Sequence, residues 1–169
     1  MLVASIDVQT ASADGPITII GTTYHDTDDD SFSMSVVFHS DDEKILLSQF
    51  IDNIKEKNPD IIIGWYVINF DLKYIIDRCK KYDIKMFSPR YRIYGCPIIQ
   101  LMNYYNGTFD DAIKSFGTTI TIENMDIKNY SLEICELQYR LFMKLGIISQ
   151  HKLVSDLLNA PYDMLTIEI

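Results

Sequence analysis

The sequence contains few cysteines, and their spacing excludes the folds that depend on them. Only Cys79, Cys96 and Cys135 occur among 169 residues. An odd number without a CxxC pair argues against a disulfide framework and against a zinc finger. We therefore expect an intracellular protein in a reducing compartment, either the cytoplasm or the nucleoid or nucleus.

Long apolar runs are also missing. No stretch reaches the roughly 18 apolar residues of a membrane span, and no basic region followed by an apolar stretch opens the chain. We expect no membrane partner. The composition, with 47% hydrophobic and 23% charged residues, is typical of one soluble globular domain over residues 1–169. A chain of this length buries roughly 70% of its unfolded surface, so its core needs no disulfide or structural metal.

Positive charge is scarce. The 15 lysine and arginine residues stand against 24 aspartate and glutamate residues, which gives a net charge of -9. Such a protein as a whole repels a phosphate backbone, so broad electrostatic binding of nucleic acid is disfavoured. A local basic strip, or an acidic metal-binding cleft that accepts one strand end, is compatible with this balance because both depend on local charge.

The first residues predict a β-hairpin followed by a third strand. Residues 2–8 and 17–24 are apolar and β-branched, and Gly15 and Pro16 signal a turn between them. A third strand is expected over residues 31–40, after the acidic stretch HDTDDD. We interpret that stretch as a solvated hairpin turn, because it lacks the glycine and the distal glutamate of a calcium-binding loop.

A strand–helix–strand crossover is expected next. Ser40 and Glu43 match a capping box for a helix over residues 41–57. The apolar run 61–67 predicts a strand that is buried on both faces. Asn69 is expected to cap the helix that follows this strand.

The second half of the chain predicts one more strand and three helices. Pro97 interrupts the strand expected over residues 91–102 or restricts it to a sheet edge, because proline cannot donate to a ladder. Helices are expected over residues 108–117, 126–145 and 148–158. Together these elements predict an α/β domain with a mixed sheet. The long helix carries an apolar stripe made of Tyr130, Ile134, Leu137, Leu141 and Leu145.

Two aspartates are the first candidates for chemistry. Asp7 lies inside an apolar strand, and Asp71 directly follows the buried strand and precedes a helix. A carboxylate in such a place is costly to bury unless a partner or a metal compensates it. The alternative for Asp7 is an aspartate at a strand end that bonds to backbone or faces solvent.

The residues around these aspartates resemble a known family. The run PDIIIGWYVINFDLKYIIDRCKKYDI (59–84) resembles the second exonuclease motif of family B DNA polymerases, with the bacterial polymerase II type nearest. SIDVQT (5–10) with GPITIIG (15–21) resembles the first motif, and NYSLEICELQYRLFMKLGII (129–148) the third. The segments 42–60 and 108–117 are similar to the flanking helices. The resemblance covers almost the whole chain in order.

This resemblance implies a ribonuclease-H-like (DnaQ-type) fold with a mixed central sheet flanked by helices. Active relatives remove nucleotides 3′ to 5′ from a single-stranded primer end. They use two magnesium ions, which activate water and stabilise the entering and leaving oxygens. Four acidic side chains hold these ions, because Mg²⁺ prefers anionic oxygen ligands. The polymerase palm, fingers and thumb are absent from the sequence.

The family's acidic positions are only half retained. The resemblance places the first-motif aspartate at Asp7 and the second-motif aspartate at Asp71, which are thus the candidate catalytic and metal-binding residues. The first-motif glutamate is replaced by Gln9 and the third-motif aspartate by Ile134. Two carboxylates supply two negative charges, whereas four nearly cancel the charge of two divalent ions. We expect the remaining pair to be insufficient for two metals.

Other positions of the family's site are carried over in part. Tyr130, which in relatives helps to orient the attacking water, is retained, whereas Tyr66 replaces the second-motif asparagine. Together with Phe70 and Asn69, Tyr66 is a candidate DNA contact, although a lone aromatic at a strand end is more often packing than stacking. Trp65 is expected in the core rather than on a nucleotide-stacking surface.

Three functions follow from these patterns. The first is a catalytically inactive exonuclease-like domain of, or derived from, a family B polymerase, which needs no cofactor. Its role would be structural or would lie in contacting single-stranded or primer-end DNA, a polymerase core or other replication proteins. The second is an active exonuclease that uses Mg²⁺ or Mn²⁺ and takes a third carboxylate from Asp126, Glu133 or Asp77. The third is a stand-alone protein-interaction module, which the charge of -9 makes reasonable.

Overall fold

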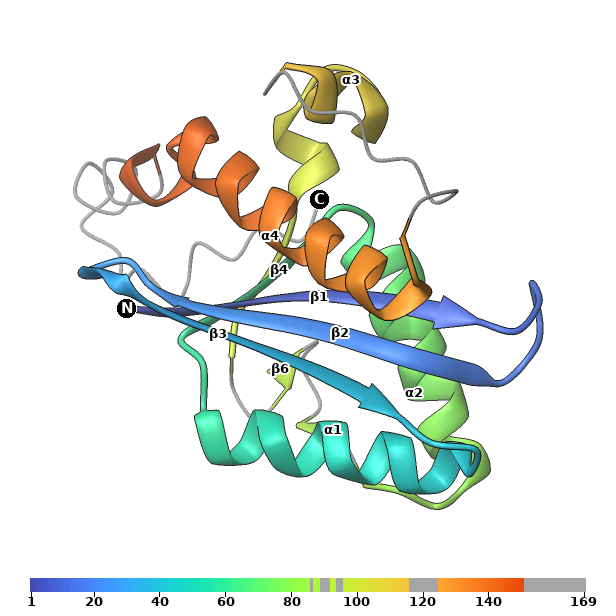
Figure 1. Cartoon of the computed structure of the whole chain (residues 1–169). Helices are drawn as coiled ribbons and strands as arrows, with labels where there is room; N and C mark the ends of the chain where they lie inside the picture. The colour runs from blue at the N-terminus through green and yellow to red at the C-terminus, as the bar shows by residue number, and fades with distance from the viewer. Residues whose placement is uncertain (86, 89–91, 94–95, 116–124, 151–169) are drawn as a thin grey trace.

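A mixed five-stranded sheet forms the centre of the molecule (Figure 1). The computed structural model describes residues 1–85, 87–88, 92–93, 96–115 and 125–150. The sheet order is β3-β2-β1-β4-β7, in which β1, β2 and β3 are antiparallel while β4 and β7 run parallel to β1. These strands are β1 (Leu2–Thr10), β2 (Ile17–Asp26), β3 (Asp29–His39), β4 (Ile61–Gly64) and β7 (Ile98–Gln100). The expected mixed sheet is therefore confirmed.

The strand expected over residues 91–102 is divided. A short antiparallel pair, β5 (Phe87–Ser88) and β6 (Arg92–Ile93), forms a separate sheet. β7 begins directly after Pro97 and occupies the edge of the main sheet. The carbonyl of Pro97 accepts a hydrogen bond from the backbone N–H of Ile62 at 2.9 Å. The expected interruption and edge position are both confirmed, because Pro97 can accept a hydrogen bond but cannot donate one.

Helices cover both faces of the sheet. α1 (Glu43–Lys57) and α2 (Leu72–Lys81) lie on one face, and α4 (Ile127–Leu145) crosses the other (Figure 1). Successive residues of a strand point to opposite faces. Ala4, Ile6 and Val8 of β1 therefore join the core under α1 and α2. The residues between them, Ser5 and Asp7, point towards α4, where each contacts an α4 side chain.

The start of α1 differs from the expected capping box. Asp42, not Ser40, is the N-cap, and its Oδ1 accepts hydrogen bonds from the backbone N–H groups of Lys44 at 2.8 Å and Ile45 at 3.4 Å. The Asp42 side chain thus satisfies two backbone N–H groups of the first turn, as short polar side chains do when they cap a helix. Glu43 is thus free to turn inward, where it is buried.

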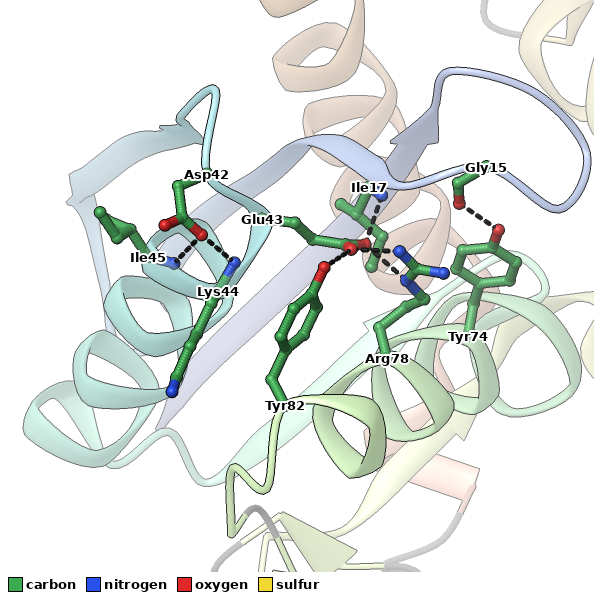
Figure 2. A network of polar contacts seen from close by, with 9 residues as sticks. All are labelled: Gly15, Ile17, Asp42, Glu43, Lys44, Ile45, Tyr74, Arg78 and Tyr82. Carbon is green, nitrogen blue, oxygen red and sulfur yellow. Dashed lines mark hydrogen bonds and ion pairs between the residues drawn. The ribbon is translucent and has the colours of Figure 1, made fainter.

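Glu43 is the centre of a polar network that joins three elements (Figure 2). Its Oε1 accepts hydrogen bonds from the backbone N–H of Ile17 at 2.7 Å and from Arg78 Nε at 2.6 Å. Its Oε2 accepts from Arg78 Nη2 and from the hydroxyl of Tyr82 at 2.8 Å. Beside it, the hydroxyl of Tyr74 donates to the carbonyl of Gly15 at 2.5 Å. The network fastens α1 and α2 to the start of β2.

Replacing Glu43 with alanine should destabilise the fold strongly. Arg78, with 17% of its side chain exposed, would lose its anionic partner in a mostly buried place. Removing one member of a buried ion pair typically costs about 3 to 5 kcal/mol, and we expect about 3 kcal/mol in urea unfolding. Lys80→Ala is the control, since its pair with Asp77 is exposed, and such pairs contribute about 0 to 1 kcal/mol. Equal losses in the two variants would contradict this prediction.

α2 does not begin at a side-chain cap. A π-helical turn, Val67–Asp71, runs directly into it, and Asn69 is exposed instead of capping. The backbone N–H groups of Ile68 and Asn69 donate to Oε1 of Gln100, at 3.1 and 3.2 Å. The expectation for Asn69 was wrong, because a side chain from β7 satisfies these N–H groups from outside the turn.

The remaining helices agree with the sequence in their described parts. α3 (Phe109–Lys114) opens with a capping box of Thr108 and Asp111, and α4 ends at Gly146, whose φ is 61°. Of the expected apolar stripe on α4, Ile134, Leu137 and Leu141 are buried, whereas Tyr130 and Leu145 at its two ends are only partly buried. The helix expected over 148–158 lies mostly outside the described residues. Among described residues, no helix is long and apolar enough to cross a membrane.

Candidate functional site

The fold brings the two retained carboxylates together. Asp7 lies on β1, opposite Gly21 of β2, and faces α4. Asp71 ends the π-helical turn that follows β4, the strand parallel to β1. Its carboxylate accepts a hydrogen bond from the backbone of Val8, and the charge of Asp7 acts on it directly. The two candidate residues therefore lie close enough for the charge of Asp7 to raise the pKa of Asp71, and this buried pair between β1 and the start of α2 is the candidate site.

Asp71 is the more buried of the two carboxylates, with 7% of the residue exposed. Burial, together with the nearby negative charge of Asp7, raises the pKa of Asp71 from 3.8 to about 7. Its hydrogen bond from the backbone of Val8 acts in the opposite direction but is the smaller effect. At neutral pH the cleft thus carries less than two full negative charges.

The Asp7 carboxylate accepts hydrogen bonds from two side chains of the chain. Its Oδ2 accepts hydrogen bonds from Nε2 of Gln9 at 2.8 Å and from the hydroxyl of Ser131 at 2.6 Å. Burial raises the pKa of the Asp7 carboxyl, and these two hydrogen bonds reduce the rise. Gln9, at the position of the expected glutamate, therefore donates to Asp7 instead of adding a negative charge beside it.

Ile134 adds no ligand to the cleft. It lies on α4 one turn after Tyr130 and Ser131 and is buried, with 5% exposed. Tyr130 itself is partly buried, and burial together with the charges of Asp7 and Asp110 raises the pKa of its hydroxyl. The tyrosine that relatives retain thus lies within the field of Asp7.

The carboxylates considered as substitutes are engaged elsewhere. Asp126 is the N-cap of α4, where its Oδ1 accepts from the backbone N–H groups of Lys128 and Asn129. Asp77 pairs with Lys80 at 3.0 Å on the exposed side of α2. Neither side chain belongs to the cleft of the two aspartates.

Glu136, which flanks Ile134 in the sequence, faces another part of the sheet. Its Oε2 lies 3.0 Å from Nε2 of His25 on β2, and its Oε1 accepts from Arg140 Nε at 3.1 Å. Glu133 is partly buried. Within the described part of the chain, no group of three or more histidine, cysteine, aspartate or glutamate side chains could hold a metal ion. The donor set does not fit a pair of divalent cations, which requires more anionic oxygen than Asp7 and Asp71 supply.

Aromatic side chains stand at the rim beside Asp71. Tyr66 is 44% exposed and Phe70 45% exposed, and Phe70 stacks on Tyr74 with ring centroids 6.0 Å apart. Asn69 is exposed on the same π-helical turn. Such exposed rings can stack on bases of a single strand.

Trp65, in contrast, packs inward. Its ring centroid lies 6.0 Å from that of Tyr105 and 5.2 Å from that of Phe109. It is partly buried and packs against the apolar cluster that includes residues of α3 and α4, so the expected core position is met only in part.

Ser131 and Gln100 are the site residues that sequence reasoning missed. Ser131 is completely buried and contacts Asp7, 124 positions earlier in the chain. Gln100 is 4% exposed and supports the turn that ends in Asp71. The only sequence signal for Ser131 is its place directly after Tyr130, within the third motif, and none marks Gln100.

Comparisons with known proteins bear on the family and the fold of the chain. The sequence model described as "DNA polymerase family B, exonuclease domain" matches residues 4–133. The chain is 44% identical over 46 residues to the DNA polymerase delta catalytic subunit of Caenorhabditis elegans. The matched region covers 27% of this chain and 4% of that protein. It is 37% identical over 60 residues to a DNA polymerase of Thermococcus litoralis. This matched region covers 36% of this chain and 4% of that protein.

A solved structure shows the same fold. The family B DNA polymerase from the hyperthermophilic archaeon Pyrobaculum calidifontis matches with a TM-score of 0.66 and 19% sequence identity. The match covers 86% of this chain and 24% of that chain. The ribonuclease-H-like fold expected from the sequence is therefore confirmed. In each case the chain corresponds to a small part of the polymerase that it matches.

Replacing Asp71 with asparagine should change how stability depends on pH. The pKa of Asp71 is raised from 3.8 to about 7 in the folded chain, so its contribution to stability is full below about pH 4. That contribution is lost as the pH rises through about 7. Asparagine does not ionise and can still accept from Val8. Between pH 5 and pH 8, Asp71→Asn should therefore gain about 2 kcal/mol relative to the wild type in urea unfolding.

The matched control for this measurement is Asp52→Asn. Asp52 has 77% of its side chain exposed, so this variant makes the same chemical change away from the buried pair. Parallel profiles for Asp71→Asn and the wild type would contradict the raised pKa.

Proposed function

Because the chain belongs to the exonuclease domains of family B DNA polymerases, we propose that it is a degenerate member that no longer cleaves phosphodiester bonds. The observation that carries this proposal is the burial of Ile134, with 5% exposed, at the position where the resemblance implies an aspartate. An aliphatic side chain offers no lone pair to a cation. Gln9 reinforces the argument, because its amide donates to Asp7 at 2.8 Å.

Charge supports the same proposal. Two divalent cations carry four positive charges, and in low dielectric each needs anionic oxygen to replace its water. Asp7 and Asp71 supply two negative charges at most, and the raised pKa of Asp71, about 7, reduces that number near neutral pH. The hydrolytic step of the family depends on the paired cations, so a cleft that cannot hold both should not cut DNA.

We propose that the domain keeps a structural or DNA-contacting role in replication or repair. The exposed rings of Tyr66 and Phe70 support contact with a single-stranded or primer-end DNA, since stacking tolerates any base. Asn69 adds an exposed amide on the same turn. The relatives are DNA polymerases, so a polymerase core or another replication protein is the expected protein partner.

An active exonuclease is the second candidate function. It is supported by the electrostatic influence of Asp7 on both Asp71 and Tyr130, which are the positions at which the resemblance retains the family's residues. This function would require Mg²⁺ or Mn²⁺ and a further carboxylate. Glu133 is the remaining candidate, since Asp126 and Asp77 are engaged elsewhere.

Incubation with labelled single-stranded DNA in Mn²⁺ or Mg²⁺ separates the two candidates. We expect the wild type to leave the DNA intact at the level of the Asp7→Ala variant, because the cleft lacks two ligands. Gel electrophoresis with and without EDTA measures this. Shortening that EDTA and Asp7→Ala both abolish would establish the active exonuclease and refute our proposal.

A double reversion tests the proposed loss of the metal pair by thermal unfolding in Mn²⁺. Gln9→Glu with Ile134→Asp restores both missing carboxylates, so Mn²⁺ should raise the Tm of this variant while leaving the wild type unchanged. Gln9→Glu with Ile134→Asn is the matched control, since it adds polarity at the same buried position with one fewer charge. A wild-type Tm that rises with Mn²⁺ as much as that of the reverted variant would count against the loss of the metal pair.

Phe70→Ala tests the DNA-contacting role. Stacking of one base on an aromatic ring contributes about 1 to 3 kcal/mol, so the variant should bind single-stranded oligonucleotides about 5 to 100 times more weakly. Filter binding at several salt concentrations measures both the affinity and its salt dependence. Phe32→Ala is the control, because Phe32 is similarly exposed, at 43%, but lies on β3. Equal affinity of Phe70→Ala and the wild type for single-stranded oligonucleotides would show that Phe70 does not contact DNA.

A further inference from the structure

The side of α4 that faces the sheet is polar at three successive turns. Helices usually pack on a sheet through apolar side chains. Here, three buried residues spaced by four and three positions each contact a polar group of β1 or β2. The contacts are Ser131 Oγ to Asp7 Oδ2 at 2.6 Å, Cys135 Sγ to the Gly21 carbonyl at 3.3 Å, and Ser5 Oγ to Gln138 Oε1 at 2.7 Å.

The contact between Ser131 and Asp7 requires an unusually close approach of the helix. A Cβ atom added to Gly21 would lie 2.4 Å from Ser131 Oγ, so only glycine fits at this position of β2. Ser131 itself is completely buried. The serine hydroxyl therefore has no water to bond to, and its donor is committed to the carboxylate.

Asp7 receives this hydrogen bond on the same oxygen that Gln9 uses. Both donors reach Oδ2, from Gln9 Nε2 at 2.8 Å and from Ser131 Oγ at 2.6 Å. A carboxylate oxygen offers two lone-pair sites, so two donors fill its capacity. A divalent cation that bound this oxygen would have to displace one of them.

We propose that Asp7 has become a structural acceptor, and that Ser131 and Gln9 together hold α4 on the sheet in place of a cation. The inference rests on the proposed loss of the metal pair and states what the remaining carboxylate does instead. Asp7 is needed because its carboxylate accepts the hydrogen bond that joins α4 to β1; we call this contact the α4 junction. The two donors also compete with a cation for Oδ2, so they weaken metal binding at this carboxylate.

Opposite effects on stability and on metal affinity distinguish this junction from an ordinary packing contact. Removing a hydrogen bond to a charged acceptor weakens the fold, yet it frees Oδ2 for a cation. Ser131→Ala should therefore lower the Tm and, at about pH 8, raise the affinity for Mn²⁺ about tenfold, measured by calorimetric titration with Mn²⁺ alone. EDTA should leave the Tm of the wild type unchanged.

The matched control is Ser5→Ala. Ser5 is completely buried like Ser131 and donates across the same interface, but to Gln138 instead of Asp7. This variant should lower the Tm and leave Mn²⁺ affinity at the wild-type value. Gln9→Met is the second test variant if Ser131→Ala does not fold, because Gln9 is only partly buried and its amide is the other donor. It too should raise Mn²⁺ affinity.

Two results would overturn the junction. One is a Mn²⁺ affinity of Ser131→Ala that equals that of the control Ser5→Ala. If Ser131→Ala does not fold, the Mn²⁺ affinity of Gln9→Met is compared with that of Ser5→Ala instead. The other is a wild-type Tm that falls in EDTA. The proposed loss of nuclease activity fails by a separate result, the EDTA-sensitive shortening of DNA by the wild type, so the two failures can be told apart.

Discussion

Two carboxylates placed side by side in a partly closed cleft impose the constraint on which the rest of the site depends. Such a pair must take up a proton, accept hydrogen bonds or bind cations, because an isolated buried charge is too costly. In this chain Asp71 follows the first course, with a pKa raised to about 7, and Asp7 follows the second, with donors from Gln9 and Ser131. Under the proposed function, both courses stabilise the two carboxylates without the third, cation binding.

The fold and the position of the cleft could be predicted because local sequence carries them. Alternation and turn residues mark β1 and β2, and the motif around Asp71 places a carboxylate at the end of the turn that follows a parallel strand. The replacement of two family carboxylates by Gln9 and Ile134 is what the resemblance implies, and it stays a prediction. The ordered match to a polymerase family gave the ribonuclease-H-like fold, which the solved polymerase structure confirms.

Contacts between distant elements could not be predicted in the same way. Ser40 and Glu43 fit a capping box, but Glu43 turns inward because Arg78, 35 positions later, supplies a cation that the local pattern does not contain. The contact of Ser131 with Asp7 depends on the register of α4 against β1 and on the space that Gly21 leaves. A helical pattern fixes which residues share a face, but it does not fix which strand atoms they meet.

A crystal of the wild-type chain soaked in Mn²⁺ tests the central claim most directly. Anomalous scattering locates each bound manganese without reference to activity. Paired catalytic cations lie about 3.5 to 4 Å apart in enzymes that cut phosphodiesters. The account predicts no such pair of peaks between Asp7 and Asp71, with Ser131 and Gln9 still bonded to Asp7. Two peaks at that spacing, with both donors displaced, would contradict it.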